Sequence, residues 1–384
     1  THPMLTVLTA YDRQPLLDIP MHQAADAERM LEIAVDCFRQ RDRWLAKSRR
    51  IAILKTLALR LADEQESLAL TIAREGGKPL KDARVEAARA VDGIDRTIQA
   101  LANLHGEEVP MGLTPAAEGR MAFTLREPIG VVVAISAFNH PLNLIVHQVI
   151  PAVAAGCPVI VKPALTTPLS CLRLADLLRE SGLPDGWCQV CIADDTVASQ
   201  LASDPRIAFL SFIGSAKVGW SLRSRLAPGV RCALEHGGVA PVLVDRTADV
   251  DAMIPKLVKG AFYHAGQVCV SVQRVFVPRD LAGDIAARLA RAAEALIVGD
   301  PTREDTDVGP LIRPSDVERV DAWVQEAVAA GAVLVTGGKK LPHGCYAPTV
   351  LLDPPANARV STMEVFGPVL CVYGYQNLDA AVEQ

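Results

Sequence analysis

A chain of 384 residues with 50% hydrophobic and 22% charged residues has the composition of a globular protein with two or three domains. Its net charge of −5, without a long basic run, argues against a nucleic-acid partner, and no apolar stretch reaches membrane-spanning length. Nine scattered cysteines and no visible signal peptide favour a cytoplasmic location over a disulfide framework.

The first hundred residues are predicted to be helical, because apolar side chains recur at helical spacing through 22–105. A break at 76–79 contains two glycines and a proline. A loop is expected at 110–119, and residues 121–126 alternate as an exposed strand would.

From residue 128 onward, short apolar strands alternate with helices, which predicts a parallel α/β sheet that binds ligands at the carboxyl ends of its strands. The predicted strands are 130–135, 158–161, 187–192, 207–212 and 242–244, and the predicted helices are 143–155, 168–181, 195–201 and 216–226. Further strands are expected at 270–277, 332–335, 349–352 and 369–373, with helices at 281–296 and 314–330.

Two cysteine segments stand out. Cys269 follows Gly266-Gln-Val and precedes a predicted strand, so a ligand could approach its thiol closely, although a free cysteine is more often a small core side chain. Cys188 and Cys191 form a Cys-x-x-Cys pair within a predicted strand, where they point to opposite faces. Because no second pair follows at zinc spacing, we expect no metal there.

Four further segments place polar residues where apolar strands end. Asn139 could donate its amide N–H to an oxyanion or cap the next helix, and Lys162 could bind a ribose or phosphate or be solvated. Gly214-Ser215 opens a helix and suits a pyrophosphate, although the G-x-G-x-x-G fingerprint is missing. Glu235 would be a general base if partial burial raised its pKa, or merely an exposed turn residue.

Together these parts suit one reaction. A thiolate attacks an aldehyde, an amide stabilises the oxyanion, hydride leaves to a dinucleotide, and a carboxylate activates water to release the acid.

Six segments in order resemble the aldehyde dehydrogenase superfamily over essentially the whole chain. They are Phe138-Asn-His-Pro141, Lys162, Phe212-Ile-Gly-Ser215, Glu235-His-Gly-Gly238, Gly266-Gln-Val-Cys269 with Arg274, and Glu364-Val-Phe-Gly-Pro368. Each is modest evidence by itself, whereas six in order identify the family.

The resemblance implies a role for each of these residues. Cys269 is the nucleophile, Asn139 the oxyanion donor and Glu235 the base for deacylation. Cofactor-binding roles fall on Lys162 and Glu364 for the two riboses, on Gly214 and Ser215 for the phosphates, and on Phe366. No metal is implied.

The resemblance also implies the architecture. We expect N-terminal helices of the NAD-binding domain at 1–108, an oligomerisation strand segment at 109–127, a Rossmann-like NAD-binding domain at 128–234 and an α/β catalytic domain at 235–384. Superfamily members usually continue for several tens of residues further, so the catalytic domain is expected to be truncated here. A homodimer or homotetramer is implied.

Three positions depart from the usual pattern. His264 stands where many members have Asn, and His140 replaces a common Phe. Leu165 occupies the position of a Glu that binds the adenosine ribose in NAD-preferring members. NAD is therefore expected, with NADP left open.

The strings around Asn139, Glu235 and Cys269 look most similar to the phosphonoacetaldehyde dehydrogenase branch, with lactaldehyde and non-phosphorylating glyceraldehyde-3-phosphate dehydrogenases as alternatives. A phosphonate requires Arg or His donors, and the candidates are Arg89 and His140. The aromatic content of 4% weakly disfavours a tunnel for aryl aldehydes.

Other classes of protein remain as alternatives. A cysteine hydrolase or thioesterase would need no dinucleotide, and an inactive scaffold would not need Cys269, Glu235 and Asn139 together. A CoA-acylating dehydrogenase would have less need of Glu235 as a base.

Overall fold

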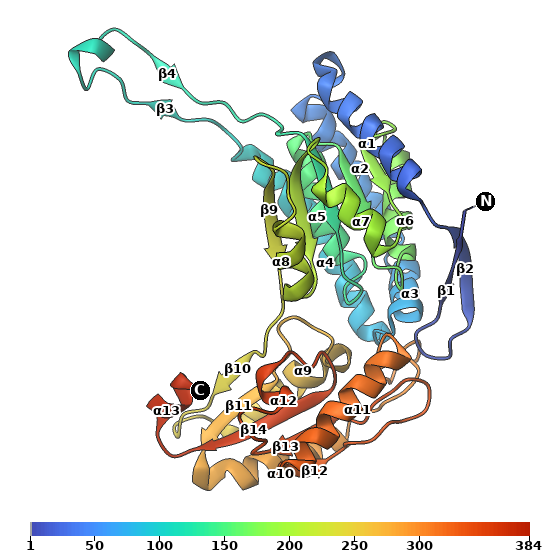
Figure 1. Ribbon diagram of the computed structural model, residues 1–384, viewed down its shortest axis with the longest axis vertical. Coiled ribbons are helices and arrows are strands. Elements are labelled where there is room, and N and C mark those ends of the chain that lie inside the picture. The colour runs from blue at the N-terminus through green and yellow to red at the C-terminus, as the bar shows by residue number, and fades with distance from the viewer. Residues whose placement is uncertain (1) are drawn as a thin grey trace.

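The computed structural model describes residues 2–384, which form two α/β units, each built on a five-stranded sheet. Figure 1 shows the units as two bodies, and the chain passes from the first to the second between β9 and β10. Across the described residues, no helix is long and apolar enough to cross a membrane.

The first sheet is entirely parallel and has the strand order β7-β6-β5-β8-β9. Its strands are β5 (Val131–Ile135), β6 (Val159–Lys162), β7 (Cys188–Val190), β8 (Ile207–Ile213) and β9 (Arg231–Glu235). The chain builds from β5 toward β7 and then returns to the other side of β5 with β8. The carboxyl ends of β5 and β8 therefore form a topological switch point, where open α/β sheets bind ligands.

Helices cover both faces of this sheet. Val132 and Ala134 of β5 face a core formed with α2 to α6, whereas Val131, Val133 and Ile135 face α1, α7 and α8. Burial on both faces explains why these strands are continuous apolar runs. The helices are α1 (Ala24–Arg39), α2 (Lys47–Asp63), α3 (Gln65–Gly76), α4 (Leu80–Ala102), α5 (Asn143–Ala155), α6 (Leu169–Glu180), α7 (Asp195–Ser203) and α8 (Ala216–Arg223).

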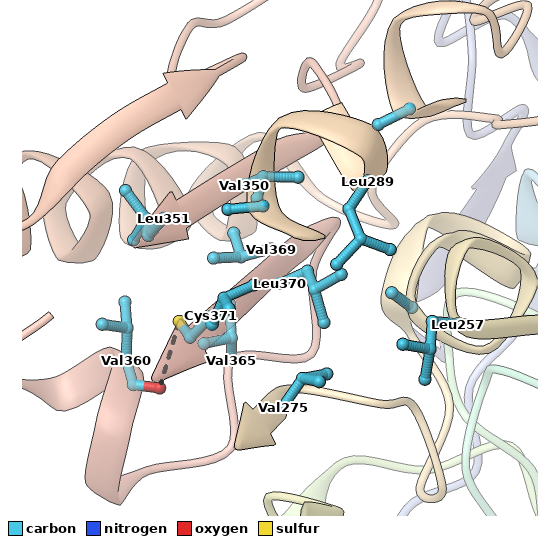
Figure 2. Packing of buried hydrophobic residues seen from close by; sticks show 14 of the residues in the cluster. Leu257, Val275, Leu289, Val350, Leu351, Val360, Val365, Val369, Leu370 and Cys371 are labelled. Carbon is cyan, nitrogen blue, oxygen red and sulfur yellow. Dashed lines mark hydrogen bonds between the residues drawn. The ribbon is translucent and has the colours of Figure 1, made fainter. Parts of the chain in front are cut away.

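The second sheet has the order β10-β11-β14-β13-β12, with β12 antiparallel at one edge. Figure 2 shows its core, where Leu257 of α9 and Leu289 of α10 lie beside strand residues such as Val275 and Leu370. Its elements are β10 (Pro241–Leu243), α9 (Val250–Phe262), β11 (Arg274–Pro278), α10 (Ala282–Glu294), α11 (Pro314–Ala329), β12 (Val333–Thr336), β13 (Thr349–Leu352), α12 (Arg359–Thr362), β14 (Val369–Tyr375) and α13 (Leu378–Glu383).

Two hairpins lie outside these sheets. β1 (Met4–Leu8) pairs with β2 (Pro15–Pro20), and β3 (Glu108–Val109) pairs with β4 (Ala122–Phe123). Figure 1 shows the second hairpin projecting far from the body of the first unit. It exposes the apolar side chains of Leu113, Met121, Phe123 and Leu125.

The structure corrects three predictions of strands. Residues 231–235 form an edge strand that was not predicted, because its alternation of exposed and half-buried side chains contains charges at both ends. The strand expected at 242–244 belongs to the second sheet rather than the first. The strand expected at 270–277 begins only at Arg274, since the residues before it form a loop, in which Gln273 is hydrogen-bonded to the segment around 360–365.

Candidate active site

The carboxyl ends of β5, β6 and β8 face a cavity of about 470 Å³ that the second unit closes from the other side. The cavity brings together most of the residues singled out in the sequence. Its lining includes Asn139, Lys162, Gly214, Ser215, Cys269, Glu364 and Phe366.

A sharp reversal of the chain presents Cys269. His264, Ala265 and Gly266 have positive φ values of 50°, 55° and 72°, so three successive residues adopt left-handed conformations. A Cβ on Gly266 would lie 2.0 Å from the carbonyl oxygen of Gly367. The glycine expected to make room for a ligand therefore makes room for the protein backbone.

Two buried glutamines fix the loop that carries Cys269, and sequence reasoning assigned neither of them a role. Gln267 donates to the carbonyl oxygens of His264 and Pro310 at 3.2 Å, and its Oε1 accepts from the Ile312 N–H at 3.0 Å. The Gly-Gln pair before the cysteine was the feature of the sequence that could have pointed to a structural role for Gln267.

Gln273 links the same loop to the segment that carries Glu364. It donates to the carbonyl oxygens of Val360 at 2.8 Å and Met363 at 2.7 Å, and it accepts from the Val365 N–H at 3.0 Å. Because Glu364 lies between two of these contacts, Gln273 positions Cys269 and Glu364 relative to each other.

The thiol of Cys269 is half-buried beside acidic groups. Burial raises its pKa, the charges of Glu364 and Glu235 raise it further, and the side chain of Asn139 lowers it. The Asn139 amide is 1% exposed, and no described residue satisfies its oxygen or nitrogen with a well-formed hydrogen bond. The resting group is therefore a thiol that needs a proton acceptor, beside an amide free to bind an oxyanion.

Glu235 ends the edge strand β9, and its backbone carbonyl accepts from the Gly214 N–H at 3.1 Å. Its side chain is exposed rather than partly buried, which is one of the two alternatives that the sequence left open. The carboxylate nevertheless acts on its surroundings, since it raises the pKa of both Cys269 and His147.

The other end of the cavity suits a dinucleotide. The side chain of Ser215 accepts from the Val218 N–H at 3.4 Å and caps α8, leaving the start of this helix beside the cavity. A Cβ on Gly214 would lie 2.7 Å from the ring of Phe212, so a glycine is needed for the turn to pack against this ring. Lys162 lies at the end of β6, with its Nζ 3.5 Å from Asp195.

Glu364 completes a cradle that it forms with Lys162, Gly214 and Ser215. Its Oε1 is buried without a hydrogen-bond partner among the described residues, and a Cβ on Gly237 would lie 1.7 Å from this oxygen. Burial raises its pKa, against a lowering contribution from a backbone hydrogen bond with Gly238. Phe366 meets Phe138 edge to face, with ring centroids 5.8 Å apart. An unpartnered acceptor in a glycine-lined cradle fits the hydroxyls of a ribose.

The family model described as the aldehyde dehydrogenase family matches residues 2–384. The chain belongs to this family. Its fold and its class of chemistry, the oxidation of aldehydes by an oxidoreductase that uses NAD or NADP, follow from that membership.

Three similar proteins show the range of this aldehyde dehydrogenase's relatives. A 3-sulfolactaldehyde dehydrogenase from Priestia megaterium is 36% identical over 382 residues, which are 99% of this chain and 79% of that protein. Aldehyde dehydrogenase 21 from Physcomitrella patens, in complex with the reaction product succinate, has a TM-score of 0.94 at 34% identity, covering 100% of this chain and 79% of the other. A glyceraldehyde-3-phosphate dehydrogenase from Methanocaldococcus jannaschii, complexed with NADP, has a TM-score of 0.91 at 30% identity, covering 99% and 82%.

These relatives support the oxidation of small aldehydes. None of the three is named as a phosphonoacetaldehyde dehydrogenase, so they do not support the predicted branch.

His140, one of two residues predicted to bind substrate in this aldehyde dehydrogenase, lies in a buried cluster. Its Nδ1 is 2.6 Å from the Nζ of Lys78, which also contacts Glu86 at 2.5 Å. Burial lowers the pKa of His140 to about 2, and the charges of Lys78 and Arg89 act in the same direction. His140 is therefore neutral and retains an Nε2–H donor, so its predicted role toward a phosphonate would be that of an uncharged N–H donor.

Arg89, the second predicted substrate residue, does not line the cavity of Cys269. It lines a neighbouring cavity of about 410 Å³ together with Arg96 and His147. Burial and then Arg89 lower the pKa of His147, whereas Glu235 raises it. The charges of Arg89 and Glu235 thus both act on His147.

Proposed function

We propose that the protein oxidises a small anionic aldehyde to its carboxylic acid, through a thioacyl intermediate on Cys269 and with a nicotinamide dinucleotide as hydride acceptor. The observation that carries this proposal is the half-buried thiol of Cys269 beside the unpartnered amide of Asn139, in a cavity continuous with the carboxyl ends of a parallel sheet.

In the first half of the reaction, Glu235 accepts the thiol proton, directly or through a water molecule. The Sγ of Cys269 then bonds to the aldehyde carbon, and the carbonyl oxygen takes the electron pair as an oxyanion that the Asn139 amide N–H stabilises. The bound dinucleotide supplies the acceptor for the hydride that leaves this carbon.

In the second half, Glu235 first releases the thiol proton to solvent and then takes a proton from water, and the resulting hydroxide attacks the thioacyl carbon. The carbon–sulfur bond breaks, the acid leaves, and the thiolate recovers a proton from Glu235. The exposure of Glu235 gives it access to water, and its charge raises the pKa of Cys269, which supports this role.

The cofactor site is proposed from the cradle described above. Lys162 and Glu364 would bind the hydroxyls of the two riboses, Gly214 and Ser215 with the start of α8 would bind the phosphates, and Phe366 would pack on the nicotinamide side. NAD is the proposed cofactor, and NADP is the alternative.

Two observations support an anionic aldehyde. The substrates or products in the names of the three relatives are a sulfonate, a carboxylate and a phosphate. Arg89 and His147 line a second cavity together with Arg96, which pairs with Asp92 at 3.3 Å, so Arg89 provides the guanidinium group that suits such an anion. Phosphonoacetaldehyde and 3-sulfolactaldehyde are the two candidate substrates, and neutral His140 is proposed as an N–H donor rather than a cation.

Subunit association is proposed for the segment 109–127. The hairpin of β3 and β4 exposes Leu113, Met121, Phe123 and Leu125, which no other part of the described chain covers. Their burial against another copy would remove a large apolar surface from water.

The substrate proposal is tested by kcat/KM for phosphonoacetaldehyde, 3-sulfolactaldehyde, glyceraldehyde 3-phosphate and uncharged lactaldehyde. We expect one anionic aldehyde to exceed lactaldehyde by about a hundredfold, or about 2.7 kcal/mol. Arg89→Gln should lose most of that preference, and Arg291→Gln, an exposed arginine of α10, should keep it. Equal values for charged and uncharged aldehydes would overturn the anionic assignment.

A further inference from the structure

The cofactor cavity contains an ion pair that no step of the reaction uses. Lys162, which is largely buried at the end of β6, has its Nζ 3.5 Å from Oδ1 of Asp195, the first residue of α7. Both residues line the cavity. The Asp195 side chain is otherwise fully exposed, so its second oxygen is free to meet a ligand.

The position of this pair in the sheet assigns it to one end of the dinucleotide. β6 and β7 lie on one side of β5, whereas Glu235 ends β9 at the opposite edge. Asn139, which follows central β5, and Cys269 mark the reacting end of the cavity. The pair of Lys162 and Asp195 therefore faces the end of the dinucleotide away from the reaction, which is the adenosine.

Dinucleotide sites distinguish NAD from NADP by charge at the adenosine ribose. A carboxylate accepts from the 2′-hydroxyl of NAD and repels the 2′-phosphate of NADP, which instead requires cationic donors. Leu165, which also lines this part of the cavity, offers neither charge. Lys162 alone would favour the phosphate, and the carboxylate of Asp195 offsets its charge.

The start of α7 gives a 2′-phosphate no compensation. A helix N-terminus ordinarily offers backbone N–H groups to an anion. Here the side chain of Asp194 already accepts from the N–H groups of Thr196 and Val197, each at 3.0 Å. The phosphate would meet the carboxylate of Asp195 and a helix start whose N–H groups are already occupied.

We infer that Asp195 selects NAD over NADP by accepting a ribose hydroxyl and repelling a 2′-phosphate. The inference rests on the proposed dinucleotide-dependent function and adds to it the residue that decides the cofactor. The carboxylate acts together with Lys162, which holds it at the cavity.

The test is the dissociation constant of NADH and of NADPH, measured by calorimetric titration without any aldehyde. We expect the parent protein to bind NADH more tightly. Asp195→Asn should tighten NADPH binding on the order of tenfold, because it removes one negative charge close to the 2′-phosphate, and leave NADH within about twofold. The amide keeps an oxygen that can accept from the hydroxyl.

Asp194→Asn is the matched control. It removes an equal charge from a residue that does not line the cavity, and Asn also caps a helix well. The NADPH-to-NADH ratio should therefore change by less than about twofold. A parent protein that prefers NADPH, an unchanged ratio in Asp195→Asn, or an equal change in both variants would overturn the inference. Binding of neither dinucleotide would instead overturn the proposed function and the inference with it.

Discussion

Lys78 has no exposed surface, and it supports the loop that carries the oxyanion donor. Its ammonium group lies between Glu86 and His140, while Oε1 of Glu86 accepts from the N–H groups of Leu142 and Asn143 at 3.0 and 3.1 Å. These contacts hold the segment directly after Asn139, at His140 and at the start of α5. Lys78 and Glu86 are therefore positioning residues for Asn139.

Replacing Lys78 by Met should destabilise the fold by about 3–5 kcal/mol, because the Glu86 carboxylate would remain buried without its counter-ion. Urea unfolding measures this loss. The control is Lys81→Met, which breaks a more exposed ion pair with Asp307 and should cost less than about 1 kcal/mol. Equal losses in the two variants would contradict a special role for Lys78.

The sequence motifs were sufficient to choose Cys269, Asn139, Lys162 and Glu364, which the structure brings to one cavity. They were not sufficient for the state of His140, because its neutral form depends on Lys78, more than sixty residues earlier in the chain. The choice between an exposed and a partly buried Glu235 stayed open for a similar reason, since it depends on which strand lies at the sheet edge.

Among the elements, the turn at 263–266 does most to place the nucleophile. It joins α9 to the loop of Cys269 through three left-handed residues, and Gly266 lies against the backbone of Gly367. Sequence alone pointed to a glycine-containing turn there. Its contact with a segment one hundred residues later was not visible from local pattern.

Gly266→Ala should destabilise the protein by more than about 3 kcal/mol, because the new methyl group clashes with backbone and the residue has positive φ. Gly283→Ala is the control, since nothing lies within 4 Å of its Cβ position in α10. That change should be neutral or stabilise by up to about 1 kcal/mol. Thermal unfolding compares them, and a stable Gly266→Ala protein would contradict the described turn.

Most of the predicted helices and strands were found in the structure, because period-2 and helical patterns of apolar residues are strong in buried elements. The misplaced strands lie at the junction between the two units. β9 is an edge strand with charged residues, and β10, which follows within six residues, belongs to the other sheet. Local alternation does not show to which sheet a short strand belongs.

At the scale of the whole molecule, the site exists only where the two units meet. The first unit supplies Asn139, Lys162 and Gly214 to the cavity, and the second supplies Cys269 and Glu364. The alternation of strands and helices predicted each sheet, whereas their meeting at one cavity was implied by the family resemblance alone. Within the second unit, Gln273 links the loop of Cys269 to the segment of Glu364 and so fixes the positions of these two residues relative to each other.

The central claim is that Cys269 carries the acyl group and Glu235 releases it. Rapid mixing of Glu235→Gln protein with dinucleotide and the preferred anionic aldehyde tests both halves, with mass spectrometry of the quenched protein. We expect about one equivalent of reduced dinucleotide per site in a burst, an acyl adduct on Cys269, and later turnover slowed on the order of a hundredfold or more. Cys269→Ala should bind dinucleotide but give neither burst nor adduct. Steady turnover of Glu235→Gln at the parent rate, or an adduct elsewhere in the chain, would contradict the account.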